Sequence, residues 1–243
     1  MLVKTQGIVL KSVKYSETSL ILDVLTDQLG LKTYIISGVR KKNAKTGAGI
    51  LQPMNILNLV VYNKEGAGMN RIKEVKMEYI YKNLPFDIKK YSISLFLIEM
   101  ISKSIKGKEP DKEFFDFVKN SLIYLDQTRN SISVFHIVFL VKMSKFLGFM
   151  PVSNYSAYNR IFDLREGKFI KNIPFHNDHL SERESFLLSK FLNSDMEGKI
   201  DITIGREEKQ KLIRSLILYY KIHLSDFGKI KTLEIFKKVF DSI

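Results

Sequence analysis

The sequence contains no cysteine, and this absence removes several kinds of site from consideration. Disulfide bonds, Cys-ligated zinc, iron–sulfur clusters and cysteine nucleophiles all need a thiol. Long hydrophobic runs are lacking too. The longest candidates, Leu95–Ile101 and Phe135–Met143, are interrupted by polar residues and stay below the roughly 18 residues that a membrane-spanning helix needs. The first residues do not form a signal-peptide pattern, so we expect a soluble, cytoplasmic protein.

Nucleotide-binding and catalytic motifs are scarce as well. The segment Gly38–Gly49 is rich in glycine and lysine but lacks the spacing of a P-loop, and Gly66–Gly68 lacks the third glycine of a dinucleotide fingerprint. The sequence has no Gly-x-Ser-x-Gly elbow and no carboxylate cluster suited to a metal-dependent nuclease. We therefore predict that the protein is not an enzyme and needs no cofactor.

Four histidines remain as possible metal ligands. His136 and His223 lie in apolar helical patterns, so we interpret them as packing residues. His176 and His179 are the one pair that could begin a metal site, but such a site needs further ligands. We therefore expect no metal and interpret this pair as part of a solvated loop.

Acidic residues are too few to balance the basic ones. The 243 residues include 39 Lys and Arg against 26 Asp and Glu, which gives a formal net charge of +13 and a pI of about 9.6. A domain pI above about 9 is typical of nucleic-acid-binding proteins. An anionic membrane surface would also attract this charge, but the sequence lacks a basic amphipathic helix of the kind that lies on membranes.

Much of the positive charge lies in one stretch, Gln28–Lys64, which has no Asp or Glu and contributes +6 of the net charge. Four of its six basic residues lie between Gly38 and Gly49, and strand-like runs precede and follow that glycine-flanked segment. A cationic loop held between two strands is suited to follow the backbone of a polyanion. The alternative is a loop whose charges serve only solubility.

The first 82 residues are predicted to form strands. Five apolar or alternating runs are separated by turn residues: Gly7–Val13, Ser19–Thr26, Leu31–Ser37, Met54–Tyr62 and Ile72–Tyr81. In the last run, Val75, Met77, Tyr79 and Tyr81 share one face. Five short strands predict a small closed barrel of the OB type, although an SH3-type barrel fits the count equally well.

After Pro85 the apolar period becomes helical, so we expect residues 83–243 to form an all-α helical domain. The predicted helices lie around Phe96, around Phe117, and at Ser133–Leu147, Ser181–Phe191, Arg206–Leu224 and Thr232–Phe240. The third is apolar on nearly all sides, as a central buried helix would be. The fourth opens with a capping box.

Three tyrosines lie on or beside the strands of the basic part: Tyr15, Tyr34 and Tyr62. An exposed ring beside Lys or Arg stacks on a nucleic-acid base with about 1–3 kcal/mol per base. The other role is to fill the barrel core, which is the one we expect for each ring. Alternation does not decide between the two roles, because each run is apolar on both sides.

Several short motifs follow one another in a recognisable order. They are Gly7–Leu10, Tyr15–Thr18, Thr26–Leu31, Gly38–Lys42, Leu51–Pro53, Phe146–Pro151, Tyr219–Leu224 and Lys231–Glu234. In this order and spacing the chain resembles the RecO family of bacterial recombination mediators over essentially its whole length. The resemblance implies an N-terminal OB barrel at residues 1–82, followed by a helical domain.

The resemblance also implies a function. RecO-like proteins bind single- and double-stranded DNA, anneal complementary strands, and act with RecR to help load RecA on DNA coated by single-strand-binding protein, whose acidic C-terminal tail they bind. We therefore expect a cytoplasmic, nucleoid-associated, non-enzymatic mediator of DNA repair. The residues alone leave one alternative open, an RNA- or ribosome-associated OB-fold protein.

The predicted DNA-binding residues come from two sources. The basic segment after Gly38 matches the DNA-contacting region of the family, which points to Arg40, Lys41 and Lys42. The residues themselves add three more: Lys32 and Lys45 by charge and proximity in sequence, and Arg71 by its position beside the last strand. The full set is Lys32, Arg40, Lys41, Lys42, Lys45 and Arg71.

One departure from the family concerns zinc. Family members often carry a four-Cys zinc site shortly after the Gly-Phe-x-Pro step, here Gly148–Pro151. The irregular segment Val152–His179 has no cysteine, so zinc should be absent. A small hairpin predicted at Asp163–Phe169 is interpreted as a remnant of that module, held by packing alone.

Overall fold

The computed structural model describes residues 1–41, 44, 47–64, 66, 68–105, 109–196 and 203–234. These residues form two compact units. Unit 1 contains Met1–Thr128 and the described residues from Ile230 onwards, and unit 2 contains Arg129–Lys229. The expected domain boundary between residues 82 and 83 falls inside unit 1, where strands give way to helices, and it stays a prediction.

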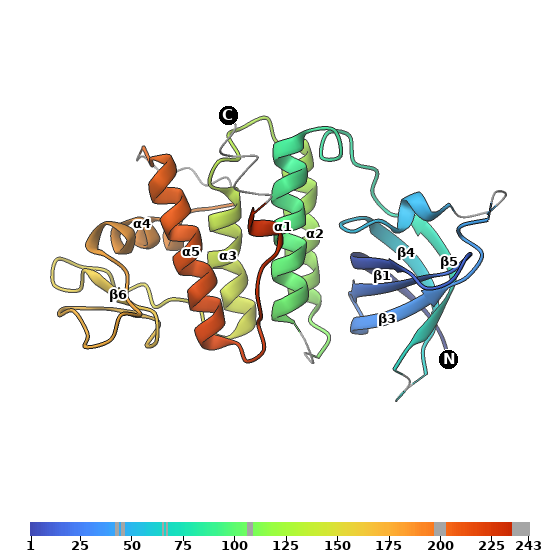
Figure 1. Ribbon diagram of the computed structural model, residues 1–243, viewed down its shortest axis with the longest axis horizontal. Helices are drawn as coiled ribbons and strands as arrows, with labels where there is room; N and C mark the ends of the chain where they lie inside the picture. Colours follow the sequence, from blue (N-terminus) through green and yellow to red (C-terminus); the bar gives the residue numbers. More distant parts are fainter. Residues whose placement is uncertain are drawn as a thin grey trace. The chain divides into compact units, whose positions relative to one another are not determined.

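Unit 1 begins with a closed five-stranded barrel, which confirms the predicted fold class. Its strands are β1 (Leu2–Lys14), β2 (Leu20–Thr26), β3 (Gly30–Ile36), β4 (Ile56–Tyr62) and β5 (Asn70–Met77), in the order β1-β2-β3-β5-β4 (Figure 1). Because β4 returns to pair with β1, the order β4-β1-β2-β3 is that of a Greek key, and β5 closes the barrel through a parallel pair with β3. A five-stranded Greek-key barrel is the OB-fold, so the strand order favours this type over the SH3 alternative.

Alternation along the strands fills the barrel core. The inward-facing buried side chains include Val9, Leu22, Val24, Tyr34, Leu57, Leu59, Val61 and Ile72. A short 3-10 helix, Ala48–Leu51, follows β3 and adds Leu51 to this core. Gly7 lies where β1 pairs with both β2 and β4. A Cβ there would lie 2.6 Å from Val24 Cγ1 and 2.8 Å from Leu59 Cδ1, so the close approach requires glycine.

The last strand is shorter than its alternation predicted. β5 ends at Met77, so Tyr79 and Tyr81 do not continue one face of a strand. Instead, the Tyr79 hydroxyl donates to Asp126 Oδ2 (2.9 Å) and the Tyr81 hydroxyl donates to the carbonyl of Met54 (2.7 Å). The prediction was wrong here because tertiary hydrogen bonds, rather than pairing in the sheet, position the two tyrosine side chains.

The segment after β5 is held by the carboxylate of Asp126, which lies near the end of α2 (Lys112–Gln127) and is fully buried. Its oxygens accept hydrogen bonds from the backbone N–H groups of Lys82, Asn83 and Leu84 at 2.7–3.1 Å. Burial opposes ionisation, but these donors outweigh it and hold the pKa of Asp126 below its ordinary value. One carboxylate therefore replaces the partners that these backbone groups would have in a sheet.

Other polar contacts connect α1 (Ile88–Ser104) and α2, which lie side by side in Figure 1, to the remainder of unit 1. Lys119 on α2 donates to Gln6 Oε1 (2.9 Å) on β1 and to Glu78 Oε1 (3.1 Å), one residue past the end of β5. Glu99 on α1 accepts from the backbone N–H groups of Lys231 (2.9 Å) and Thr232 (2.7 Å). The chain therefore returns to unit 1 after completing unit 2.

Unit 2 is built around α3 (Phe135–Leu147), which packs against α4 (Glu182–Asn193) and α5 (Arg206–His223). Every residue from Phe135 to Val141 is buried, as predicted for a central helix. Gly148 ends α3 with φ +86°, and Ser181 opens α4 with the predicted capping box. The small hairpin is also confirmed, as β6 (Ile161–Asp163) and β7 (Lys168–Ile170). The predicted helix at Thr232–Phe240 lies outside the described residues after Glu234.

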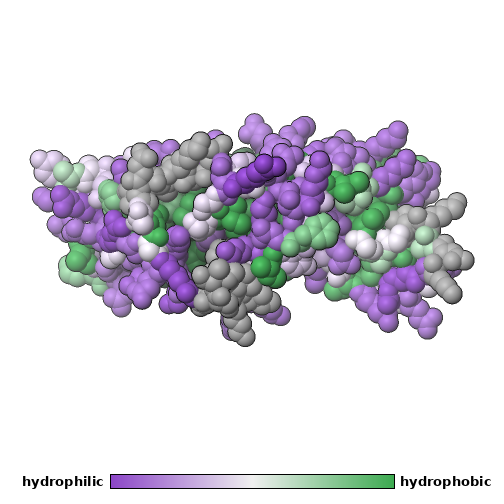
Figure 2. Space-filling model, turned by 90° about the horizontal axis from the view of Figure 1, so that it is seen from above, coloured by the Kyte–Doolittle hydropathy of each residue, from purple (hydrophilic) through white to green (hydrophobic). Residues whose placement is uncertain are grey.

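The described helices pack against neighbouring elements of their own units. None of the helices in the described part of the chain is long and apolar enough to cross a membrane. On the face shown in Figure 2, hydrophilic side chains cover most of the surface and hydrophobic ones form small separate patches. The apolar stripes of the sequence are therefore used mainly in the cores of the two units.

Replacing Asp126 with Asn should destabilise unit 1, because an amide cannot accept all the hydrogen bonds that the carboxylate accepts. We expect the free energy of unfolding at pH 7 to fall by about 3 kcal/mol in urea titrations. The matched control is Asp116→Asn on the same helix. It breaks an exposed ion pair with Lys112 and should cost less than about 1 kcal/mol.

Acid should reduce the difference between wild type and Asp126→Asn. The pKa of Asp126 is depressed in the folded state, so its contribution is present above the unfolded pKa of about 3.9 and is lost as the pH falls through the folded pKa. We expect the difference in unfolding free energy to shrink below about pH 4. A difference that stays constant into that range would contradict the role given to the carboxylate.

Candidate nucleic-acid interface

Three segments that are distant in sequence meet at one end of the barrel. The loop Tyr15–Ser19 joins β1 to β2, Ser37–Lys41 follow β3, and the third segment comprises the described residues between β4 and β5, which are Asn63, Lys64, Gly66, Gly68 and Met69. The register brings them together, because Leu20 pairs with both Lys14 and Ile36, while Arg71 pairs with both Ile35 and Tyr62. We call these three segments, together with Lys14, Tyr62 and Arg71, the loop end. In OB-folds, the β1–β2 and β4–β5 loops bind oligonucleotides together with the face of β2 and β3.

Arg40 connects the segment after β3 to the β1–β2 loop. Its Nη1 donates to the carbonyls of Ser16 (3.2 Å) and Glu17 (3.1 Å), and its backbone N–H donates to the carbonyl of Thr18 (3.4 Å). Gly38, with φ +80°, makes the turn that brings the chain to this loop. A guanidinium has five N–H donors and Arg40 stays exposed. Arg40 therefore positions the β1–β2 loop, and its remaining guanidinium N–H groups can still donate to an anion.

The structure brings part of the predicted DNA-binding set together. Arg40, Lys41 and Arg71 lie exposed at the loop end, where Arg71 Nη2 is 3.5 Å from Ser37 Oγ. Lys32 is also exposed, but it lies near the other end of β3, about 16 Å along the strand from Ser37. Lys42 and Lys45 lie outside the described residues, so their place in the interface stays a prediction.

The three tyrosines take different positions. Tyr34 points into the barrel core with 0% exposure, where burial raises its pKa to about 12, so it is not available to stack on a base. Tyr15 and Tyr62 are 62% and 47% exposed, and both lie at the loop end. The loop end therefore combines two accessible rings with exposed Lys and Arg.

The charge of the loop end is predominantly positive. Among its described residues, the cations Lys14, Arg40, Lys41, Lys64 and Arg71 outnumber the single carboxylate of Glu17, while Glu65 lies outside the described residues. Sequence reasoning did not select Lys14 and Lys64 as site residues. Lys64 belongs to the acid-free stretch and could have been included on that signal, whereas Lys14 joins the site only through the pairing of β1 with β2.

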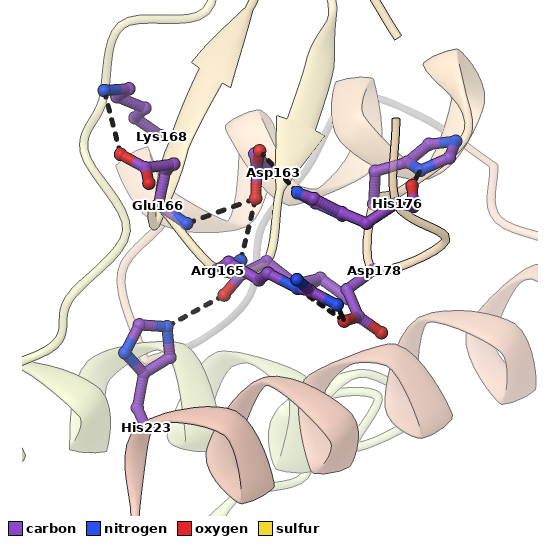
Figure 3. Close-up of polar contacts among 9 residues, drawn as sticks. Asp163, Arg165, Glu166, Lys168, His176, Asp178 and His223 are labelled. Carbon is purple, nitrogen blue, oxygen red and sulfur yellow. Dashed lines mark hydrogen bonds and ion pairs between the residues drawn. The ribbon is translucent and has the colours of Figure 1, made fainter. Parts of the chain in front are cut away.

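His176 of unit 2 belongs to a polar network rather than to a solvated loop (Figure 3), and His179 Nδ1 lies 2.9 Å from the carbonyl of His176. The buried Asp163 accepts from the backbone N–H groups of Arg165 (2.8 Å) and Glu166 (3.1 Å), and its Oδ2 lies 3.3 Å from His176 Nε2. Arg165 also pairs with Asp178 at 2.7 Å. The hairpin is therefore held by hydrogen bonds and ion pairs as well as by packing, which corrects the expectation of packing alone.

The remaining histidines are packing residues, as predicted. His136 is buried in α3, where burial, together with the charge of Lys209, lowers its pKa to about 3. His223 stacks on Phe149 with ring centroids 5.2 Å apart, and its Nε2 lies 2.8 Å from the carbonyl of Leu164. Within the described ranges, no group of three or more His, Cys, Asp or Glu side chains could hold a metal ion.

Comparison with known proteins shows similarity along nearly the whole chain. The family model for the N terminus of recombination protein O matches residues 1–81, and the model for its C terminus matches residues 85–234. A DNA repair protein RecO from Azobacteroides pseudotrichonymphae is 32% identical over 241 residues, which cover 99% of this chain and 100% of the relative. The proteins of the same name from Phocaeicola vulgatus and Flavobacterium psychrophilum are 30% and 34% identical, with 99% of this chain and 100% of each relative covered. These names give no support to the RNA- or ribosome-associated alternative.

Replacing both Tyr15 and Tyr62 with Ala should weaken the binding of a labelled single-stranded oligonucleotide. Stacking contributes about 1–3 kcal/mol per base, so we expect the Kd to rise about 5- to 150-fold for each ring. Fluorescence anisotropy measures this change, and the Tyr→Phe variants at both positions should retain the wild-type Kd.

The matched control is Tyr34→Phe. It removes a buried hydroxyl that has no hydrogen-bond partner within the described structure, so stability should stay equal or increase and binding should not change. An unchanged Kd for the variant with both Tyr15 and Tyr62 replaced by Ala would show that these rings do not contact the strand.

Proposed function

This chain belongs to the RecO family of DNA repair proteins, and from that premise we propose that it binds DNA strands through the loop end and anneals complementary ones without cleaving them. The observation that carries this proposal is the grouping of Lys14, Arg40, Lys41, Lys64 and Arg71 with the exposed rings of Tyr15 and Tyr62. The membership of the family supports a role in DNA repair and recombination. The loop end supports the particular mode of binding.

The cations at the loop end would contact phosphates. Lysine and arginine bind phosphate groups without reading the base, so they fix the path of the strand and leave its sequence undetermined. Tyr15 and Tyr62 would add stacking, which every base accepts. The expected result is tight, salt-dependent binding that is indifferent to sequence.

Annealing follows from the same charges. Two DNA strands repel each other through their phosphates, and a surface rich in Lys and Arg reduces this repulsion when it neutralises part of the charge. A strand held by its backbone keeps its bases free to pair. We place this activity in the cytoplasm, at the nucleoid, where the protein would act with RecR to help load RecA on single-stranded DNA coated by single-strand-binding protein.

The proposed mechanism involves no catalytic step. The sequence has no nucleotide-binding loop or nucleophile elbow, and the buried carboxylate Asp126 is engaged by backbone N–H groups. We propose that the protein contributes binding and alignment, which are sufficient for two strands to anneal.

The triple variant Lys41→Ala, Lys64→Ala and Arg71→Ala tests the loop end. Each lost phosphate contact should reduce the slope of log K against log salt by about 0.7 on a single strand, so the slope should flatten by about 2. Anisotropy titrations at several salt concentrations measure the slope. Arg40 is left unchanged because it also holds the β1–β2 loop.

A charge-matched control removes three other exposed lysines, Lys76, Lys82 and Lys171, which lie outside the loop end. Its slope should stay close to that of the wild type. Equal flattening in both variants would mean that net charge, and not the loop end, governs binding. The annealing rate of complementary oligonucleotides should fall only in the first variant, and metal-dependent cleavage of the labelled strand by the wild type would refute the non-enzymatic proposal.

A further inference from the structure

The outer face of α5 carries a row of exposed residues at helical spacing. Lys211, Arg214, Leu218 and Lys221 follow one another at intervals of three or four residues, and all are exposed. Residues three and four apart lie on the same side of a helix. The opposite side of α5 is buried in the core of unit 2 through Leu212, Ile213, Leu216, Ile217, Tyr219 and Tyr220. We call the exposed row the α5 ridge.

The cations of the ridge are not used to stabilise unit 2. Within the described structure, the side chains of Lys211, Arg214 and Lys221 make no hydrogen bond and no ion pair. Lys211 lies near enough to Glu208 to help lower the pKa of that carboxyl, behind the larger effects of Arg183 and the backbone N–H of Gly205. The ridge cations therefore have most of their charge available for a partner.

The carboxylates nearest in sequence or across the helix pair are mostly engaged elsewhere. Glu208 accepts from Arg183 Nε (2.6 Å) and from the backbone N–H of Gly205 (2.8 Å). Glu184 on α4 accepts from the hydroxyl of Ser215 at 3.1 Å. Glu207 stays exposed at the first turn of α5, one turn before Lys211. From Lys211 to Lys221 the exposed charges of the helix are all positive.

We propose that the α5 ridge is a second phosphate-binding surface, which holds a second nucleic-acid strand while the loop end holds the first. The row from Lys211 to Lys221 spans about 15 Å at 1.5 Å per residue. One strand of a duplex carries a phosphate about every 3.4 Å along the axis, so the ridge faces about four phosphates. The ridge has no aromatic side chain to stack on a base, so it contacts the backbone alone.

This assignment rests on the proposed function for the class of ligand and adds a second place for it. Annealing needs two strands on the protein together, and the loop end accounts for one. The ridge is a row of Lys and Arg with one apolar residue, Leu218 at 39% exposure. Such a row matches the negative charge of a phosphate backbone better than it matches the mixed side chains on the surface of a folded protein.

The test uses the full-length chain with two non-complementary oligonucleotides, one carrying a donor dye and the other an acceptor. At equimolar chain and strands, the wild type should show energy transfer between the dyes. The variant Lys211→Ala, Arg214→Ala and Lys221→Ala should bind one strand with a Kd within about twofold of the wild type and lose the transfer. The salt slope of the second binding step should flatten by about 2, because each lost contact on a single strand removes about 0.7.

The same charge-matched variant of Lys76, Lys82 and Lys171 serves as the control and should keep the energy transfer. Because all three ridge residues are exposed, the melting temperature of the ridge variant should match that of the wild type. Transfer that persists in the ridge variant would overturn the assignment.

Two further outcomes separate this proposal from the one on which it rests. In the first, the wild type binds one strand without ever showing energy transfer, and the loop-end variant does not bind that strand. This result would overturn the assignment of the ridge and leave the proposed function intact. A wild type that binds no strand would overturn both. The wild type could also bind a labelled octa-glutamate peptide but no second strand, with the peptide lost in the ridge variant. This result would overturn the nucleic-acid assignment and identify the ligand of the ridge as an acidic protein segment.

Discussion

Unit 1 depends on the buried carboxylate of Asp126. The chain leaves the barrel at Met77, and the backbone N–H groups of Lys82, Asn83 and Leu84 then have no strand to pair with. Asp126, on α2, accepts a hydrogen bond from each of these three N–H groups and one from the Tyr79 hydroxyl. A buried charge is costly unless it is fully hydrogen-bonded, so this carboxylate is stable only while the barrel, the connecting segment and α2 are all in place. Barrel and helices therefore depend on each other.

The closure of the barrel creates the loop end. Lys14, Arg40, Lys64 and Arg71 come from four different parts of the sequence, and no local motif contains them. Antiparallel pairing of β1 with β2 and parallel pairing of β3 with β5 bring them to one rim. Arg40 then fixes the β1–β2 loop through the carbonyls of Ser16 and Glu17. A hydrogen-bonded rim that carries exposed charged side chains suits a ligand whose sequence varies and whose backbone does not.

Much of the fold could be predicted from the sequence, because period-two and helical patterns record which side chains face a core. This explains why the strands, the buried α3 and the capping box at Ser181 were predicted. The end of β5 was not predicted. The alternation continues through Tyr79 and Tyr81 and does not reveal the contact with Asp126, which lies far along the chain. The same limit applies to the site. Only the barrel register shows that Tyr34 points inward while Tyr15 and Tyr62 stay exposed, and that Lys32 lies apart from Arg71.

The return of the chain to unit 1 has a consequence for the synthesis of the protein. Glu99 accepts hydrogen bonds from the backbone N–H groups of Lys231 and Thr232, which are translated 132 and 133 residues after it. At about 5–20 residues per second, a ribosome needs roughly 7 to 26 seconds to produce them. During that interval the rest of α1, then α2 and all of unit 2 are made, while the barrel already exists without the segment that completes unit 1. Until then, the carboxylate of Glu99 lacks the backbone donors that it has in the folded unit.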